Sequence, residues 1–462
     1  MTFPKYPEYK DSGVEWLGEV PAHWNHGKVR YFAKLESGHT PSRNKPEYWE
    51  NCTVPWFTLS DVWKIRSGLT KVVYETKEKV SELGLANSSA RLLPADTVIL
   101  SRTASVGYSA ILGKPMATTQ DFANWICGKK LFPEYLLSVF RAMKSEFSRM
   151  MMGSTHKTIY MPDIAELYCA IPPMHEQYKI VTFLDYEAAR IDALVEEQQR
   201  LIKLLKEKRQ AVISHAVTKG IDPDVPMKDS GVEWLGKVPA HWNHGKVRYF
   251  AKLESGHTPS RNKPEFWENC TIPWFTLADV WKIRSGSTRF VHETKEKVSA
   301  LGLANSSARL LPVGTVILSR TASVGYSAIL GKPMATTQDF ANWVCKEELQ
   351  PEYLLAVFRS MKSEFSRMMM GSTHKTIYMP DIAELYCAVP PITEQAEIVA
   401  FLDKETARID ALVEEGESAI KLLQERRSAL ISATVTGKID VRGWQPPTDS
   451  TASTEAAQTE VV

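Results

Sequence analysis

TVILSRTASVGYSAILGKPMATTQDFANW occupies residues 97–125, and the same letters return unchanged at residues 315–343. Sliding the chain by 218 residues aligns residues 10–218 with residues 228–436 without a gap, and the two copies differ at 36 of these 209 positions. A period of this length exceeds the roughly 20–50 residues of a solenoid repeat. The sequence therefore predicts two domain-sized copies joined head to tail.

The composition is that of an ordinary globular protein. The chain has 462 residues, of which 44% are apolar and 24% charged, so it is long enough for two domains with their own cores. No apolar run approaches the roughly 20 residues that a membrane span needs, and the first residues have no apolar signal-peptide core. We therefore expect a cytoplasmic protein. A net charge of +2 neither requires nor excludes a nucleic acid, because acidic helices can balance a basic face.

Six cysteines recur at equivalent places in the two copies, without any CxxC pair. They are Cys52, Cys127, Cys169, Cys270, Cys345 and Cys387. We interpret them as three buried thiols per copy in a reducing compartment. The ligand spacing that zinc sites need is absent, so we expect no bound metal.

Short apolar runs separated by Gly, Pro and Ser fill the body of each copy. Residues 54–59, 97–102 and 107–112 are typical of strands. Residues 133–151 predict a helix, because large apolar residues recur there at helical spacing. Each body is thus expected to be a mixed, strand-rich domain.

A long helix is predicted after the Pro-Pro pair at residues 172–173. Residues 176–217 contain no Gly or Pro, and residues 394–435 repeat the pattern with Gly416 as the exception. Two heptad positions carry an apolar stripe, interrupted only by Gln198 and Arg209 and formed by Leu184, Ile191, Leu205 and Val212 together with Ala188, Val195, Ile202 and Ala216. At about 1.5 Å per residue each helix is a rod of roughly 60 Å, longer than such a domain is wide. We expect the two rods to pack together; the alternative is that each covers its own domain.

Catalytic motifs are absent from the sequence. The Pro-Pro pairs lack the acid or amide before them and the aromatic residue after them that adenine methyltransferases carry. The stretch GYSAILGKP (107–115) departs from a phosphate-binding loop, because five residues rather than four separate its glycines and Pro115 replaces the metal-binding hydroxyl. The histidines recur with the domain, and we interpret them as structural. We therefore expect no catalytic residue and no enzyme activity in this chain.

The order of these elements resembles the specificity subunit of type I restriction-modification systems, the HsdS family. The resemblance covers about residues 10–440. It is carried by KDSGVEWLGEVPAHW (10–24), GSTHKT (153–158), the Pro-Pro-x-x-Glu-Gln start of the helix (172–177 and 390–395), the helix end KEKRQAVISHAVTKG (206–220) and the duplication itself. The combination is highly specific, although each piece alone is weak. The resemblance implies an α+β fold, in which two pseudo-two-fold related globular mixed α/β recognition domains are separated by two long antiparallel coiled-coil helices.

Domain boundaries, partners and cofactors follow from this resemblance as expectations. The implied parts are a first target recognition domain (1–173), a long helix (174–220), a second recognition domain (221–391) and a second long helix (392–440). The remaining residues (441–462) are expected to be a disordered tail, because most of them are small, polar or acidic. Implied partners are double-stranded DNA and two modification subunits, which methylate adenine N6 with S-adenosylmethionine. Restriction subunits would add ATP-dependent cleavage. No cofactor is expected on this chain. A stand-alone DNA-binding protein and a non-catalytic interaction scaffold remain as alternatives.

The near identity of the two copies leads to a hypothesis about the target. In this family the two recognition domains usually differ, and so do the two half-sites. Antiparallel rods would relate two like domains by a two-fold axis, so that each meets its own DNA strand equivalently. We therefore predict that the target is an interrupted palindrome. The differences that could make the half-sites diverge are Ser60/Ala278, Leu69/Ser287, Tyr74/His292 and residues 128–130 against 346–348, the last expected to be a surface turn.

Four segments of each copy carry side chains of the types that bind the bases and phosphates of DNA. In the first copy the predicted contacts are Lys64, Arg66, Arg102, Thr103, Ser105, Thr119, Gln120 and Lys157. In the second copy they are Lys282, Arg284, Arg320, Thr321, Ser323, Thr337, Gln338 and Lys375. We expect SRTASVG (101–107) to form an exposed tip between two strands, and the segment DVWKIRSG also offers Trp63. The alternatives are a plain hairpin turn and solvated charges at strand ends.

The surfaces for modification subunits are expected on the outer helix faces and the KDSGVEWLG segments. Trp16 and Trp234 are candidate anchors there, because tryptophan is enriched at binding hot spots. The alternative is that each packs inside its own domain.

Overall fold

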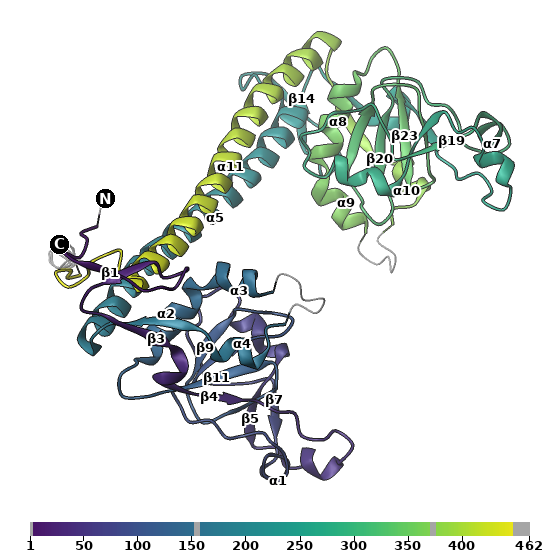
Figure 1. The fold of residues 1–462 in the computed structure, drawn as a ribbon. Coiled ribbons are helices and arrows are strands. Elements are labelled where there is room, and N and C mark those ends of the chain that lie inside the picture. Colours follow the sequence, from purple (N-terminus) through teal and green to yellow (C-terminus); the bar gives the residue numbers. More distant parts are fainter. Residues whose placement is uncertain (1–2, 152–157, 370–375, 447–462) are drawn as a thin grey trace, which may run out of the picture. The chain divides into compact units, whose positions relative to one another are not determined.

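The chain folds into two compact units in a computed structural model that describes residues 3–151, 158–369 and 376–446 (Figure 1). Unit 1 contains the chain up to residue 198 and from residue 419 onward, and unit 2 contains residues 199–418. Each unit therefore holds the globular body of one copy and part of each long helix. The units divide in the middle of the helices, whereas the predicted domain boundaries fall at the helix ends.

A five-stranded sheet lies at the centre of unit 1. Its strand order is β4 (Ala33–Ser37), β11 (Phe122–Cys127), β8 (Val98–Ser101), β9 (Ser109–Leu112), β6 (Val72–Val73). Neighbours are antiparallel except β6, which runs parallel to β9. Every residue of β8 and β9 is buried, which explains why the sequences of these strands are apolar with only small polar residues. The strands predicted at residues 97–102 and 107–112 are thus confirmed.

Smaller sheets and short helices surround this central sheet. A three-stranded sheet has the order β10 (Ala117–Thr118), β5 (Val54–Phe57), β7 (Glu78–Val80), and two pairs join β1 (Tyr9–Asp11) to β2 (Glu19–Pro21) and β3 (Asn25–Lys28) to β12 (Tyr168–Ile171). The short helices are η1 (Val29–Tyr31), η2 (Pro46–Trp49), η3 (Leu59–Lys64), α1 (Glu82–Ala86) and α4 (Met161–Ala165).

The helix predicted over residues 133–151 is broken into α2 (Pro133–Ala142) and α3 (Lys144–Met150). The break falls at Met143, whose ψ of 15° leaves the helical range. Its amide is shared between the carbonyls of Val139 and Phe140, as is common at helix ends. Since Met143 is itself buried, the turn lets α2 and α3 bury their apolar sides in one core at different angles.

Unit 2 repeats these elements with few changes. Its sheets contain β16 (Ala251–Ser255), β23 (Phe340–Cys345), β20 (Val316–Ser319), β21 (Ser327–Leu330) and β18 (Phe290–Val291); β22 (Ala335–Thr336), β17 (Ile272–Phe275) and β19 (Glu296–Val298); β13 (Met227–Asp229) with β14 (Lys237–Pro239); and β15 (Asn243–Lys246) with β24 (Tyr386–Val389). Its short helices are α6 (Val247–Phe250), η4 (Pro264–Trp267), η5 (Leu277–Lys282), α7 (Ala300–Ala304), α8 (Pro351–Ser360), α9 (Lys362–Met368) and α10 (Met379–Ala383).

The two predicted long helices are confirmed as α5 (Met174–Lys219) and α11 (Ile392–Val435). They pair within each unit and run in opposite directions there (Figure 1). In unit 2, Arg209 contacts Asp410 and Lys206 contacts Glu417. Residue numbers therefore fall along α5 as they rise along α11, so the two helices are antiparallel there. The residues of the predicted stripe are buried or half-buried, whereas most of those between them are exposed. Stripe-to-stripe packing is therefore the observed arrangement.

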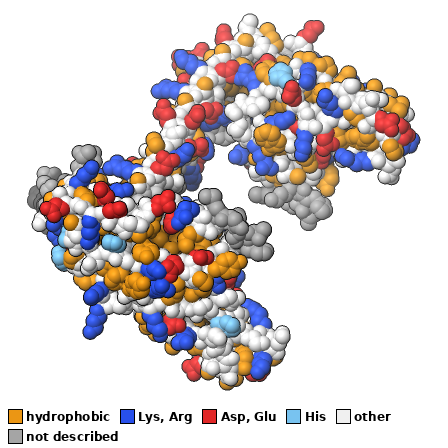
Figure 2. All heavy atoms as spheres, in the orientation of Figure 1, with side chains coloured by type: hydrophobic (Ala, Val, Ile, Leu, Met, Phe, Trp, Pro, Cys, Tyr) orange, Lys and Arg blue, Asp and Glu red, His pale blue; other side chains and the backbone are white. Residues whose placement is uncertain are grey.

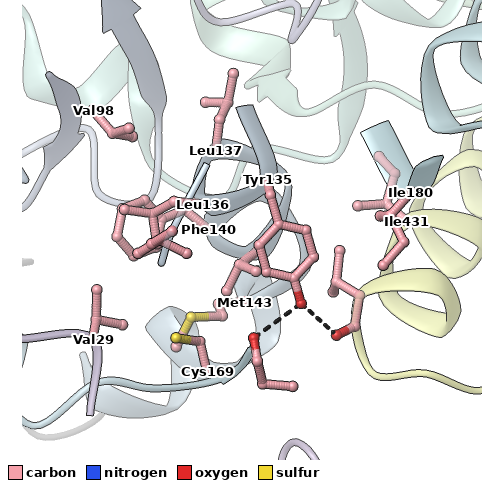
Figure 3. Packing of buried hydrophobic residues seen from close by; sticks show 14 of the residues in the cluster. Val29, Val98, Tyr135, Leu136, Leu137, Phe140, Met143, Cys169, Ile180 and Ile431 are labelled. Atoms are coloured by element: carbon pink, nitrogen blue, oxygen red, sulfur yellow. Dashed lines mark hydrogen bonds between the residues drawn. The ribbon is translucent and has the colours of Figure 1, made fainter. Parts of the chain in front are cut away.

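Each unit completes its core with the end of the other copy's helix. In unit 1 the buried hydroxyl of Tyr135 on α2 donates to the carbonyl oxygens of Ala170, at 3.0 Å, and of Val435 at the end of α11, at 3.3 Å (Figure 3). In unit 2 the equivalent Tyr353 donates to Val217 at the end of α5, at 3.2 Å. Ile180 of α5 and Ile431 of α11 lie in the same core as Tyr135.

The Glu-Gln pair at the start of each long helix fixes the helix to its domain. Buried Glu176 accepts hydrogen bonds from Trp24 Nε1 at 2.9 Å and Tyr6 Oη at 3.1 Å, and it contacts His23 at 2.7 Å. Gln177 donates to the carbonyls of Pro172 and Lys130 and accepts from a backbone amide. Glu394 and Gln395 repeat the pattern. The motif thus satisfies buried polar groups where the helix leaves the sheet, and His23 has the structural role that the sequence suggested.

The first and last described residues pack together in unit 1. Asp440 N donates to Pro4 O at 2.8 Å, Val441 is buried, and the ring of Trp444 lies 5.3 Å from that of Phe183. The expectation of a disordered tail from residue 441 is therefore wrong for residues 441–444, because apolar side chains there enter the core. The rest of the predicted tail from residue 447 lies outside the described residues.

The expectation that all three thiols of each copy are buried is correct for only one of the three. Only Cys169 and Cys387 are buried; the other four thiols are half-buried, because they lie at strand ends and in loops. Trp16 and Trp234 are half-buried and pack against their own domains' cores. Among the described residues, no helix is long and apolar enough to cross a membrane.

Candidate nucleic-acid interface

The predicted contacts that the structure describes gather at one edge of the central sheet in each unit. Strands β4 and β8 end at this edge, and β9 and β11 begin there, because neighbouring strands are antiparallel. The parallel strands β5 and β10 end beside it, since Phe57 aligns with Thr118. We call residues 38–40, 58–66, 101–108 and 118–121 the polar edge of unit 1, and residues 256–258, 276–284, 319–326 and 336–339 the polar edge of unit 2.

Hydrogen bonds tie the loops of this edge into one surface. The amide of His39 donates to Thr118 O at 3.0 Å, and Thr40 Oγ1 donates to Gln120 Oε1 at 2.7 Å. The amide of Arg102 donates to Asp121 O at 2.9 Å. Gly38 permits the close approach, because a Cβ there would stand 2.1 Å from a backbone oxygen. Three chain segments are thus held in register.

The η3 turn presents two basic residues in different states. Lys64 Nζ is 3.0 Å from the fully buried carboxylate of Asp61 and donates to a backbone carbonyl at the same distance. Arg66 is exposed, and its guanidinium lies 6.0 Å from the ring centre of Tyr108. Lys282 repeats the contact with its own aspartate at 3.1 Å, and Arg284 is exposed. Arg66 and Arg284 are therefore more available than Lys64 and Lys282 to bind a phosphate.

The loop around Arg102 is not the exposed tip that the sequence suggested. Arg102 is half-buried, its Nη1 donates to Ile159 O at 3.3 Å, and the amide of Ile159 donates back to Arg102 O at 2.8 Å. In unit 2, Arg320 makes the same contact and also donates from Nε to Gln338 O at 2.9 Å. Thr103, Ser105, Thr321 and Ser323 are half-buried. The guanidinium thus anchors the next segment instead of projecting into solvent, because that segment crosses over the loop.

The Thr-Gln pair after β10 splits into one buried and one exposed residue. Thr119 is 6% exposed, and its hydroxyl donates to Asp121 at 2.8 Å, as Thr337 does to Asp339. Gln120 and Gln338 are exposed. Thr119 and Thr337 therefore support the turn, and the amides of the glutamines reach the surface. Lys157 and Lys375 lie outside the described residues.

Sequence reasoning missed the segment that follows β4. His39 and Thr40 were not among the predicted contacts, yet they lie in the polar edge beside Gln120. The signal that indicates them is Gly38 between a strand and a polar run, since a close backbone approach often places a glycine there.

The differences between the copies fall almost entirely outside the polar edge. Only Ser60/Ala278 lies within it, and Ser60 Oγ is engaged with Thr58 Oγ1 at 2.7 Å. Tyr74 lies at the opposite end of the sheet, because it follows β6 where β6 meets the end of β9. Residues 128–130 follow the far end of β11, and Leu69 adjoins Thr70, whose carbonyl accepts from Arg141 on α2. The two edges are thus chemically almost the same.

Charges are interspersed on the surfaces of the units. On the face shown in Figure 2, Lys and Arg alternate with Asp and Glu and do not form one basic patch. Within the ranges that the structure describes, no group of His, Cys, Asp or Glu is arranged to hold a metal ion.

Comparisons with known proteins agree on one family. The type I restriction modification DNA specificity domain matches residues 21–204 and again residues 239–421. The MjaIX specificity subunit of Methanocaldococcus jannaschii, a type I restriction enzyme subunit, is 23% identical over 94% of this chain and 97% of its own. The EcoKI specificity subunit of Escherichia coli K12 is 21% identical over 93% and 91%.

Solved structures share the fold. A chain from a study of complex assembly and conformational transition in the type I R-M system aligns with a TM-score of 0.68 and 17% identity over 90% of this chain and 98% of its own. The crystal structure of the HsdS subunit from Thermoanaerobacter tengcongensis aligns with a TM-score of 0.51 and 16% identity over 91% and 98%.

Proposed function

This chain belongs to the type I restriction-modification DNA specificity family, and from that premise we propose that its two recognition domains read an interrupted palindrome in double-stranded DNA. Each polar edge reads one half-site, and the two half-sites carry the same bases on opposite strands. The observation that carries this proposal is the near identity of the two polar edges, which differ only at Ser60/Ala278.

Reciprocal contacts within the long helices support the equivalence of the two units in this proposal. Arg209 meets Asp410 in unit 2 and Arg427 meets Asp192 in unit 1, so each contact uses the same two repeat positions with the copies interchanged. Such reciprocity is typical of two equivalent partners, in which residue i meets j and j meets i. Equivalent partners suit the opposite strands of a duplex, whose backbones are themselves related by two-fold symmetry.

In this proposal the chain supplies specificity, and its partners supply the chemistry. Two modification subunits bind it and methylate adenine N6 with S-adenosylmethionine, and restriction subunits, where present, use ATP and Mg²⁺. This chain carries neither catalytic residues nor a cofactor of its own, and it works in the cytoplasm, where its DNA is. The predicted contacts that remain best placed are Arg66, Gln120 and their counterparts Arg284 and Gln338, because these side chains are exposed on the polar edges.

Sequencing that detects N6-methyladenine in single DNA molecules tests the proposal. The chain is expressed with its modification subunit in a host without such methylation, and a matched culture expresses the modification subunit alone. We expect one motif whose two halves are reverse complements, present only when this chain is present. Methylation at two unrelated half-sites would refute the palindrome, and absence of any chain-dependent motif would refute the function.

A further inference from the structure

Trp63 and Trp281 are exposed to an unusual degree. Both are 67% exposed, and among the thirteen tryptophans of the chain, all within the described residues, only these two are largely exposed. Tryptophan is normally well buried, because it carries the largest apolar surface of any side chain. An exposed tryptophan that the fold repeats in both units therefore needs a reason outside the core.

The turn that carries Trp63 is rigid. The hydroxyl of Thr58 caps η3, and the fully buried carboxylate of Asp61 accepts from the amides of Thr58 at 3.3 Å and Lys77 at 2.8 Å. Val62 and Ile65, on either side along the chain, are buried in the domain core. With these neighbours turned inward, Trp63 is held outward by a fixed backbone. η5 places Trp281 in the same way, with Asp279 fully buried.

The position of the ring belongs to the polar edge. η3 starts where β5 ends, and the amide of Thr119 donates to Phe57 O at 3.1 Å, so the turn adjoins the exposed Gln120. Arg66, three residues after Trp63, reaches over Tyr108, the residue directly before β9. An apolar ring thus stands among hydrogen-bonding and cationic groups on one surface.

Because Lys64 is engaged by Asp61, the η3 turn offers the duplex little free charge besides Arg66. We propose that Trp63 and Trp281 each pack their indole ring against the sugars and base edges of the bound half-site, and so provide a non-electrostatic part of DNA affinity. Aromatic and apolar side chains make such contacts in grooves and on exposed bases. This inference rests on the proposed function, since it assigns a contact within the same DNA interface.

The test compares the DNA affinities of double variants of the full chain, each assembled with modification subunits. The duplex carries the motif that methylation mapping identifies. W63A/W281A is expected to bind roughly 10- to 100-fold more weakly, with an unchanged slope of log Kobs against log salt concentration. R66A/R284A is expected to lower that slope by about 0.9 for each phosphate that is no longer neutralised. The matched control is Y31A/Y249A, whose tyrosines are 67% and 58% exposed but lie at the opposite end of the sheet, before β4 and β16. It should leave binding unchanged.

A second measurement does not depend on the alanine variants folding. Acrylamide quenching of tryptophan emission is compared between the wild-type complex and the W63F/W281F complex, each with and without the duplex. The emission that the wild-type complex has and the W63F/W281F complex lacks comes from Trp63 and Trp281. Binding of the duplex should reduce the quenching of this emission by acrylamide.

The outcomes separate this inference from the proposed function. Unchanged DNA binding by W63A/W281A, equal losses in the Trp and Tyr variants, or quenching that DNA does not alter would overturn the proposed packing of the rings on DNA. Loss of assembly with modification subunits in W63A/W281A, with DNA affinity retained, would likewise overturn it and assign the rings to a protein partner. If the wild-type complex shows no methylated motif at all, the proposed function itself fails.

Discussion

The guanidinium of Arg209 binds the carboxylate of Asp410 through two hydrogen bonds, from Nε to Oδ1 at 2.9 Å and from Nη2 to Oδ2 at 3.3 Å. Arg209 lies near the end of α5 and Asp410 in the first half of α11. In unit 1 the arginine of α11, Arg427, meets the aspartate of α5, Asp192, at 3.0 Å. Each unit therefore depends on a charge from the other copy, and the long helices cannot be removed without weakening both domains.

Reversing the charge of Arg209 tests this dependence. Arg209→Asp places two carboxylates together, and we expect urea unfolding to show a loss of about 1–3 kcal/mol, because a partly buried charged hydrogen bond is removed. The double variant R209D/D410R should recover most of that loss. Lys206→Ala is the control: Lys206 and Glu417 are both exposed and 3.4 Å apart, so its effect should stay below about 1 kcal/mol. A double variant as unstable as the single one would argue against the pairing.

Ending the chain after residue 436 should destabilise unit 1 and leave unit 2 intact. Ile439 and Val441 are buried in the core of unit 1, and Trp444 packs on Phe183. Losing two buried aliphatic side chains costs about 3–6 kcal/mol at about 1.5–3 kcal/mol each. Hydrogen exchange followed by mass spectrometry should show faster exchange in unit 1 alone. A chain that ends after residue 446 serves as the control and should exchange like the full chain; uniform loosening of both units would contradict the prediction.

Substituting one polar edge should break the symmetry of the target. Gln338→Ala removes an exposed amide from unit 2 only, and removing a bidentate pairing with a base costs about 1–3 kcal/mol of discrimination. We expect methylation mapping to show one half-site relaxed at a single position and the other unchanged. Gln120→Ala should give the same relaxed motif, because the edges are equivalent, and the double variant should relax both halves.

Ser60→Ala is the matched control for this series. It makes the two edges identical, and Ser60 Oγ is already engaged with Thr58, so the motif should not change. A new motif in this variant would show that Ser60 reads a base.

Four thiols should resist alkylation in the folded protein. Burial raises the pKa of Cys127 and of Cys345 to about 12, from an ordinary value of 9.0, and it raises the pKa of Cys169 and Cys387 further. Since only the thiolate reacts, iodoacetamide at pH 8 should label these positions far more slowly than in urea, where all thiols react. Peptide mass spectrometry measures the rates. Equal rates in the folded and unfolded protein would contradict the burial.

The same shifts predict a loss of stability in alkali. The folded state holds these thiol protons more tightly than the unfolded chain, so above pH 9 the unfolded chain binds fewer protons and is favoured. Each such thiol contributes a slope of up to about 1.4 kcal/mol per pH unit between pH 9 and its folded pKa. Thermal unfolding from pH 8 to 11 should show a falling midpoint. Replacing Cys127 and Cys345 with Ala should flatten the decline.

Much of the architecture was predictable because it depends on patterns that are local in sequence. The duplication is visible as a shift of 218 residues, and the stripe from Leu184 to Ala216 predicts a packed helix whatever its partner is. The strands at residues 97–102 and 107–112 were equally clear, since buried strands are short apolar runs. The broken helix at Met143 was not, because a change of helix direction inside a core leaves the apolar spacing almost intact.

The candidate site was predicted less well for a related reason. Arg102, Thr119 and Gln120 are all polar residues after strands, and nothing in their spacing separates them. The fold does separate them. Arg102 donates to the carbonyl of Ile159, Thr119 is buried and donates to Asp121, and Gln120 is exposed. Residue type alone indicated candidates but not their exposure.

The sequence by itself determined that there are two nearly identical domains, that each is followed by a long apolar-striped helix, and that the family is one of DNA specificity subunits. The duplication, the apolar stripes and the family motifs are patterns of residue type along the chain, so they can be recognised without the structure. Only the tertiary structure decided that each domain takes the end of the other copy's helix, as the bond from Tyr135 to Val435 shows, and which side chains reach the surface of the polar edge. These depend on contacts between residues hundreds of positions apart, where burial and hydrogen bonding, and not local spacing, set the outcome.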